Sequence, residues 1–158
     1  MDSIFFYQNP EQSAGSGKGA LQKLKVAVQP NIFVKGWPTE AGSAALAGFK
    51  ALEDAAVVER LSGAGAVLIG STAMSEFGFG LKGSQAGCAL GKKSADVELM
   101  LDMAGEARLA AAREGVCGFK PSYGLISRIG LVGLIPSMES CGILAHDIKS
   151  VRDVLETI

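Results

Sequence analysis

Short apolar runs alternate with segments of helical periodicity along this chain, and that alternation limits the fold more than any other feature of the sequence. Strands are expected where apolar residues follow one another, at 25–28, 66–69, 97–103 and 129–136, with a further short apolar run at 116–119. Helices are expected at 54–61, 72–77, 107–113 and 147–155. Strands and helices in alternation predict the α/β fold class.

Two of these helices follow an Asp, whose side chain is expected to act as an N-cap by accepting a free backbone N–H of the first turn. Asp54 precedes the first helix and Asp147 precedes the last. In the last helix, the residues expected to face inward are Ile148, Val151, Val154 and Leu155. The segment 30–43 is rich in Pro and Gly, so it is expected to form a long structured loop.

The length of 158 residues corresponds to one domain. Residues 1–20 contain a polar, Gly-rich stretch and are expected to be a flexible or peripheral N-terminal lead-in, with residues 21–158 forming a single α/β domain. The formal net charge is −1 at pH 7. Binding to nucleic acid needs a basic excess, so nucleic acid is not expected as a partner.

The cysteines favour a reducing, intracellular compartment. Cys88, Cys117 and Cys141 are odd in number and far apart, and His146 is the only histidine, so neither a disulfide framework nor a zinc site is expected. No signal or transit peptide and no membrane-spanning segment is recognised. A presequence removed during import would leave no trace, so both cytoplasm and organelle matrix fit.

Three patterns resemble cofactor or catalytic motifs but lack the required context. Residues 15–18 (GSGK) lack the first Gly and the final Ser or Thr of a phosphate-binding loop. Residues 78–83 have dinucleotide-fingerprint glycines, but follow an expected helix instead of a strand. Lys120 and Ser122 flank a proline in an extended segment. No cofactor and no metal is therefore expected.

A series of blocks resembles the amidase signature family, which includes the A subunit of the aminoacyl-tRNA amidotransferases. The blocks occur in the family's order from about residue 21 to the C-terminus, at 24–32, 34–36, 41–43, 54–61, 65–70, 72–77, 118–124, 127–128 and 130–132. The resemblance implies a sandwich with a mixed central sheet flanked by helices, here truncated. Relative to the family, a segment between Gly80 and Gly83 and the whole C-terminal half are missing.

The family hydrolyses amides with a Ser nucleophile, a second Ser on a cis peptide and a Lys that relays protons through it. By this resemblance, Gln29 stands at the Lys position in VAVQPNI and Glu106 stands at the nucleophile position in DMAGEAR. Ser84 in KGSQAGC is the apparent survivor of the bridging Ser. A Gln side chain cannot take up a proton near neutral pH. No intact catalytic triad is therefore expected.

Other positions of the family's pocket are kept, and the resemblance marks them as a remnant of it: Asn31, Asp102, Gly105 and Arg108. In the family, backbone N–H groups around the nucleophile stabilise the developing oxyanion. Those donors here belong to 103–106, and a Glu carboxylate at a helix start attracts the same groups. We expect the Glu106 side chain to face this site and exclude substrate. An ordinary place in the first helical turn is the competing interpretation.

The sequence favours a catalytically inactive amidase-like protein, a pseudoenzyme that serves as a structural or interaction subunit of a larger assembly. One alternative is a residual amidase or glutamine-dependent amidotransferase-like hydrolase, using Ser84, Glu106 or Cys88. A second is a small amide or amino-acid binding module. Other protein subunits, or a second copy of the chain, are expected to cover the faces left by the missing half.

Overall fold

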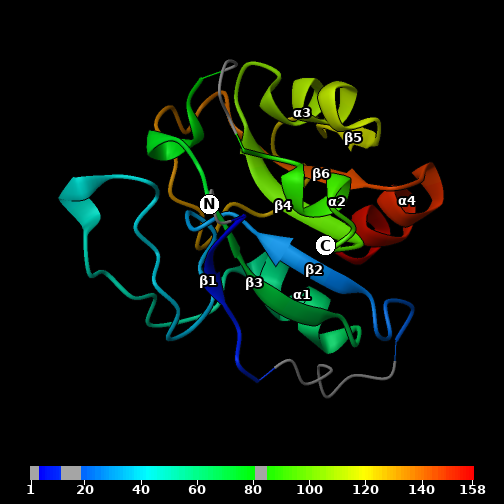
Figure 1. Ribbon diagram of the computed structural model, residues 1–158, viewed down its shortest axis with the longest axis horizontal. Coiled ribbons are helices and arrows are strands. Elements are labelled where there is room, and N and C mark those ends of the chain that lie inside the picture. Colours follow the sequence, from blue (N-terminus) through cyan, green and yellow to red (C-terminus); the bar gives the residue numbers. More distant parts are fainter. Residues whose placement is uncertain (1–3, 12–18, 81–84) are drawn as a thin grey trace.

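The computed structural model describes residues 4–11, 19–80 and 85–158 (Figure 1). Six strands form one sheet in the order β1-β3-β2-β4-β6-β5. They are β1 (Phe5–Gln8), β2 (Lys25–Val28), β3 (Val67–Thr72), β4 (Val97–Asp102), β5 (Cys117–Phe119) and β6 (Ser140–Ala145). β2 is parallel to β3 and β4, whereas the pairs β1–β3, β4–β6 and β5–β6 are antiparallel. The sheet is therefore mixed.

Helices cover both faces of the sheet. They are α1 (Ala56–Gly63), α2 (Cys88–Gly91), α3 (Glu106–Glu114) and α4 (Ile148–Thr157), with short 3-10 turns η1 (Ala44–Leu46) and η2 (Glu76–Gly78). α1 and α4 pack on one face, and α2 and α3 pack on the other. The expected α/β fold, with a mixed central sheet flanked by helices, is confirmed.

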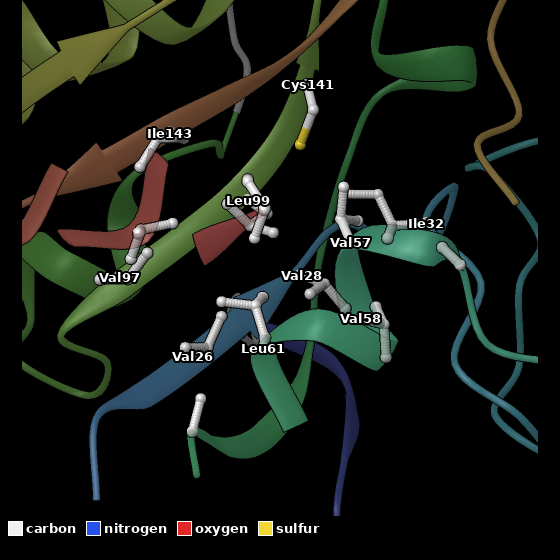
Figure 2. Close-up of a cluster of buried hydrophobic side chains, with 14 of the residues drawn as sticks. Val26, Val28, Ile32, Val57, Val58, Leu61, Val97, Leu99, Cys141 and Ile143 are labelled. Carbon is white, nitrogen blue, oxygen red and sulfur yellow. The ribbon is translucent and has the colours of Figure 1, made fainter. Parts of the chain in front are cut away.

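The alternation of side chains along β4 divides the core between the two faces. Val97 and Leu99 join the larger cluster, which α1 and α4 complete (Figure 2). Met100 points to the opposite face, where Leu90 of α2 and Ala107 of α3 pack against it. All six residues of β4 are buried, so this strand is covered on both sides.

The cap of α1 differs from the prediction. Ala55 is the N-cap and makes no side-chain hydrogen bond to the helix. The Asp54 carboxylate instead accepts the backbone N–H of Lys35 at 2.7 Å, which ties the long loop at 30–43 to the start of α1. The prediction of a capping role for Asp54 was wrong because a distant backbone donor takes its side chain.

The cap of α4 is confirmed. Asp147 accepts the backbone N–H of Ser150 at 2.8 Å, and the same residue's hydroxyl at 3.1 Å. Val151 and Val154 are buried as predicted, but Ile148 is 69% exposed. Its prediction was wrong because burial along α4 begins only with Val151, so the first turn stays in solvent.

Two further segments differ from expectation. Thr72 ends β3, and helical structure between 72 and 77 is limited to the start of η2. The apolar run from Ile129 forms an irregular loop with a single bridge between Leu131 and Ile32, and Ile129 is 69% exposed. Meanwhile β6, which the sequence did not predict, takes the place beside β4. β1, which lies in the expected lead-in, pairs with β3 at the sheet edge.

Candidate functional site

The turn between β4 and α3 brings together the candidate residues of the second half of the chain. Asp102, the last residue of β4, is fully buried. One of its carboxylate oxygens accepts the N–H of Gly105 at 2.7 Å, and the other accepts that of Ala107 at 3.2 Å. Arg108 Nε lies 3.5 Å from Asp102 Oδ2. Asp102 therefore fixes the shape of the turn and connects it to α3.

Glu106 is the first residue of α3 and is almost fully buried. Its Oε2 atom accepts three backbone N–H groups, from Met103 at 2.9 Å, Ala104 at 2.7 Å and Gly105 at 3.1 Å. All three donors belong to the segment 103–106, which the family resemblance predicts the Glu106 side chain to face. Because the same residue begins the helix, its charge also interacts favourably with the helix dipole.

Gly105 makes this arrangement possible. Its φ of +125° lies in a region that residues with a side chain rarely adopt. This conformation lets successive N–H groups of the turn converge on one point, as in the backbone nests that bind anions. While Glu106 Oε2 holds these donors, a substrate oxygen cannot use them.

A small pocket adjoins Glu106. Its volume is about 10 Å³, which is the space of one water molecule. It is lined by Phe77, Gly78, Phe79, Leu101, Met103, Glu106, Leu134 and Glu139.

Glu139, in the pocket wall, is a buried carboxylate that the sequence analysis missed. It accepts the N–H groups of Leu134 at 2.6 Å and Ile135 at 2.8 Å, and Arg128 Nη2 lies 3.2 Å away. These contacts link Glu139 to other residues of the loop that precedes β6, and so stabilise that loop. The sequence signal that could have indicated its burial is that Glu139 directly precedes the small and apolar residues 140–145.

Gln29 and Asn31 lie just after β2 and are buried. Within the described part of the chain, Gln29 Oε1 and both polar side-chain atoms of Asn31 have no hydrogen-bond partner. A Cβ atom on Gly78 would lie 3.6 Å from Gln29 Oε1 and 3.8 Å from Asn31 Nδ2. Gly78 also lines the pocket beside Glu106, so it lies next to both groups of candidate residues.

Of the remaining candidate residues, the structure describes Cys88 but not Ser84 or the GSGK stretch at 15–18, which lie outside the described residues. Cys88 begins α2, and its thiol donates to Glu114 Oε1 at 3.8 Å. Burial and the Glu114 carboxylate raise the pKa of Cys88, and burial raises the pKa of Cys141 to about 12. Both groups are therefore thiols at neutral pH, which makes them weak nucleophiles.

Among the residues that the structure describes, no three His, Cys, Asp or Glu side chains converge in a way that would hold a metal ion. In 4–11, 19–80 and 85–158, no helix has the length and apolarity needed to cross a membrane.

Comparison with known proteins supports the resemblance. The A subunit of glutamyl-tRNA(Gln) amidotransferase from Halobacterium salinarum is 37% identical over 166 residues, covering 91% of this chain and 39% of that protein. The crystal structure of the corresponding protein from Thermotoga maritima matches with a TM-score of 0.87 and 26% identity, covering 98% of this chain and 39% of that one.

A third similar protein comes from a structure described as an unexpected vestigial protein complex that reveals the evolutionary origins of an s-triazine catabolic enzyme. The TM-score is 0.83 with 28% identity, over 90% of this chain and 36% of that chain. This chain thus spans about two-fifths of the length of the relatives it matches. The model of the family described as Amidase matches residues 7–99 and 83–158. The chain belongs to the amidase family.

Proposed function

We propose that this chain is a catalytically inactive member of the amidase family that serves as a structural or interaction subunit of a larger protein assembly. One observation carries the proposal: the carboxylate of Glu106 accepts the three backbone N–H groups of the turn before α3. A residue that holds these donors removes both a nucleophile and a place for an oxyanion. Because Glu106 lies within this chain, it has this effect whatever residues precede or follow the chain.

The Lys position supports the same conclusion. Gln29 is buried and its Oε1 atom has no donor among the described residues, whereas a proton relay needs a group that titrates. Loss of a nucleophile and its base together costs about 10⁶ in turnover in enzymes where this has been measured. The pocket beside Glu106 has room for one water, which further opposes turnover of an amide.

Exposed apolar side chains support a role in an assembly. Six of them come from the loop between β5 and β6, residues 120–139, hereafter the β5–β6 loop: Tyr123, Leu125, Ile129, Leu134, Ile135 and Met138. Apolar groups gathered in one exposed segment favour contact with another protein surface. The partners we propose are other protein subunits, or a second copy of this chain, in a reducing intracellular compartment.

Activity is tested by ammonia release from glutamine and from simple amides, together with labelling by an active-site-directed fluorophosphonate. We expect neither ammonia above the uncatalysed rate nor a covalent adduct. Ammonia release that Ser84→Ala abolishes would instead establish the residual amidase or amidotransferase-like hydrolase. A Cys88→Ala variant, tested in parallel, reports whether any activity found depends on that thiol.

The assembly is tested by measuring the mass at which the chain migrates in gently prepared cell extract. We expect a mass well above the 16.3 kDa of the chain alone. Migration only at the mass of the free chain would contradict a subunit role. Saturable binding of a small amide by the isolated chain, measured by calorimetry, would favour the binding module instead.

A further inference from the structure

Glu98 is a buried carboxyl group that the proposed function does not use. It is the second residue of β4, and its side chain points to the face covered by α2 and α3. Oε1 accepts the hydroxyl of Thr72 from β3 at 2.8 Å, and Oε2 accepts the backbone N–H of Gly87 at 2.9 Å. Because Gly87 is the N-cap of α2, Glu98 joins this helix to two strands of the sheet.

Among the described residues, no cation forms an ion pair with Glu98. The charged or titratable groups that face it are Cys88 of α2, and Arg113 and Glu114 of α3. Arg113 is engaged elsewhere, with Nε 3.0 Å from Glu114 Oε1 and Nη2 donating to the Ala86 carbonyl oxygen. Burial raises the pKa of Glu98 to about 7, although its two hydrogen bonds act in the opposite direction.

Both protonation states of Glu98 can keep these two partners. The Thr72 hydroxyl donates to an ionised carboxylate, and after rotation it accepts from a protonated one. The Gly87 N–H donates in either state. The two states therefore differ chiefly in the cost of holding a charge away from water.

α2 is the element best able to relieve that cost. It has only four residues, of which Leu90 packs with Met100 of β4, while Ala89 packs with Ala27 of β2 and Ile69 of β3. Short elements with few contacts separate from a fold at a low free-energy cost. Separation of α2 would admit water to the carboxylate of Glu98.

We propose that loss of the Glu98 proton promotes local opening of α2, so that this helix is held firmly against the sheet at acidic pH and opens more often at alkaline pH. Opening uncovers an apolar surface formed by Met100 of β4, Ala107 and Ala110 of α3, and Leu144 of β6. If the carboxyl group of the open form titrates at its ordinary pKa of 4.5 and that of the closed form at about 7, linkage sets the size of the effect. The open fraction then rises by between one and two orders of magnitude from pH 5 to pH 8.

Amide hydrogen exchange measures this opening. The N–H groups of Leu90 and Gly91 both donate to the Gly87 carbonyl oxygen, at 3.0 Å, so their protection reports on α2. After correction for the intrinsic pH dependence of exchange, we expect their protection to fall 10- to 100-fold from pH 5 to pH 8. In Glu98→Gln, which imitates the protonated group, protection should be independent of pH. Unchanged protection in the wild-type chain, or a pH dependence that persists in E98Q, overturns the proposal.

A second measurement does not depend on how E98Q folds. The ¹³C resonance of the Glu98 carboxyl group is followed by NMR in the wild-type chain, with exposed Glu59 of α1 as the matched control. We expect a midpoint near 7 for Glu98. A midpoint at the ordinary value of 4.5 overturns the proposal.

Discussion

At the scale of the residue, the contacts of Glu106 have two effects: they stabilise the turn before α3, and they occupy the N–H groups that a substrate oxygen would need. Its Oε2 atom accepts three N–H groups of a turn whose shape depends on Gly105. The carboxylate satisfies three partly buried donors, so it stabilises the turn. A substrate oxygen would have to displace it. The feature that supports inactivity thus also supports the fold.

Replacement of Glu106 should therefore destabilise the protein. In Glu106→Gln, a neutral amide oxygen replaces the charged acceptor, and we expect the free energy of unfolding to fall by about 1–3 kcal/mol. Urea denaturation followed by circular dichroism measures the change. Exposed Glu53→Gln is the matched control and should stay within about 0.5 kcal/mol of the wild type. An unchanged midpoint for E106Q would show that the charge of Glu106 contributes nothing to the free energy of unfolding.

Family resemblance located Glu106, but sequence alone could not identify the other buried carboxyl groups. Glu98 follows Val97 in an apolar strand, and Glu139 precedes the small residues of β6. Alternation along a strand predicts which face a residue is on, but not whether a helix covers that face. The partners of Glu98 come from β3 and α2, which are distant in the sequence. Such burial follows from tertiary packing.

At the scale of the element, the predicted segments were those in which local pattern and tertiary packing agree. β2, β4, α3 and α4 occur where the sequence predicts them, because their apolar residues meet the core. β6 was missed because Ser140 and Gly142 dilute a strand that is nevertheless buried at every position. The run at 129–135 has strong apolar character but bends into a loop, since β6 takes the place beside β4.

A substitution at Gly133 tests whether the contacts of Glu139 stabilise the β5–β6 loop. A Cβ atom at this position would lie 1.6 Å from Oε2 of Glu139, so Gly133→Ala must displace a carboxylate that accepts two backbone N–H groups of the loop. We expect a loss of about 2–3 kcal/mol in the free energy of unfolding, measured by thermal or urea denaturation.

Gly63→Ala in α1 is the control for this substitution. No atom lies within 4 Å of its added Cβ, and Ala favours a helix, so we expect a gain of about 0.5–1 kcal/mol. Equal effects of the two substitutions would contradict a specific role for the contact between Gly133 and Glu139.

At the scale of the whole molecule, the buried charge of Glu98 sets a pH dependence of stability. The pKa of Glu98 is raised from 4.5 to about 7 in the folded state, so the folded chain binds more protons than the unfolded chain between these values. The free energy of unfolding therefore falls as pH rises from 4.5 to 7, by roughly 3 kcal/mol. The pKa values of Asp147 and Asp153 are lowered from 3.8 by hydrogen bonds from Ser150 and Lys149, so they act below this window.

Urea denaturation at pH 5, 6, 7 and 8 measures this dependence, and the difference between the wild type and Glu98→Gln isolates it. We expect the two proteins to differ most at pH 8, with E98Q the more stable. A wild-type stability that rises relative to E98Q across this range would contradict the assigned sign.

The proposed assembly depends on apolar surfaces that the isolated chain exposes to solvent. Substitutions at two exposed isoleucines test whether any exposed apolar residue supports the assembly, or only those of the β5–β6 loop. Ile129 in the β5–β6 loop and Ile148 on α4 are both 69% exposed, so an Asp at either position should leave the free energy of unfolding nearly unchanged. Ile129 has exposed apolar neighbours in its loop, whereas the other large apolar residues of α4 are shielded. If the loop meets a partner, Ile129→Asp buries a charge at the contact and shifts the chain in cell extract toward its own mass. Ile148→Asp should leave the assembly intact. A shift caused equally by both variants, or by neither, would remove the β5–β6 loop as the interface.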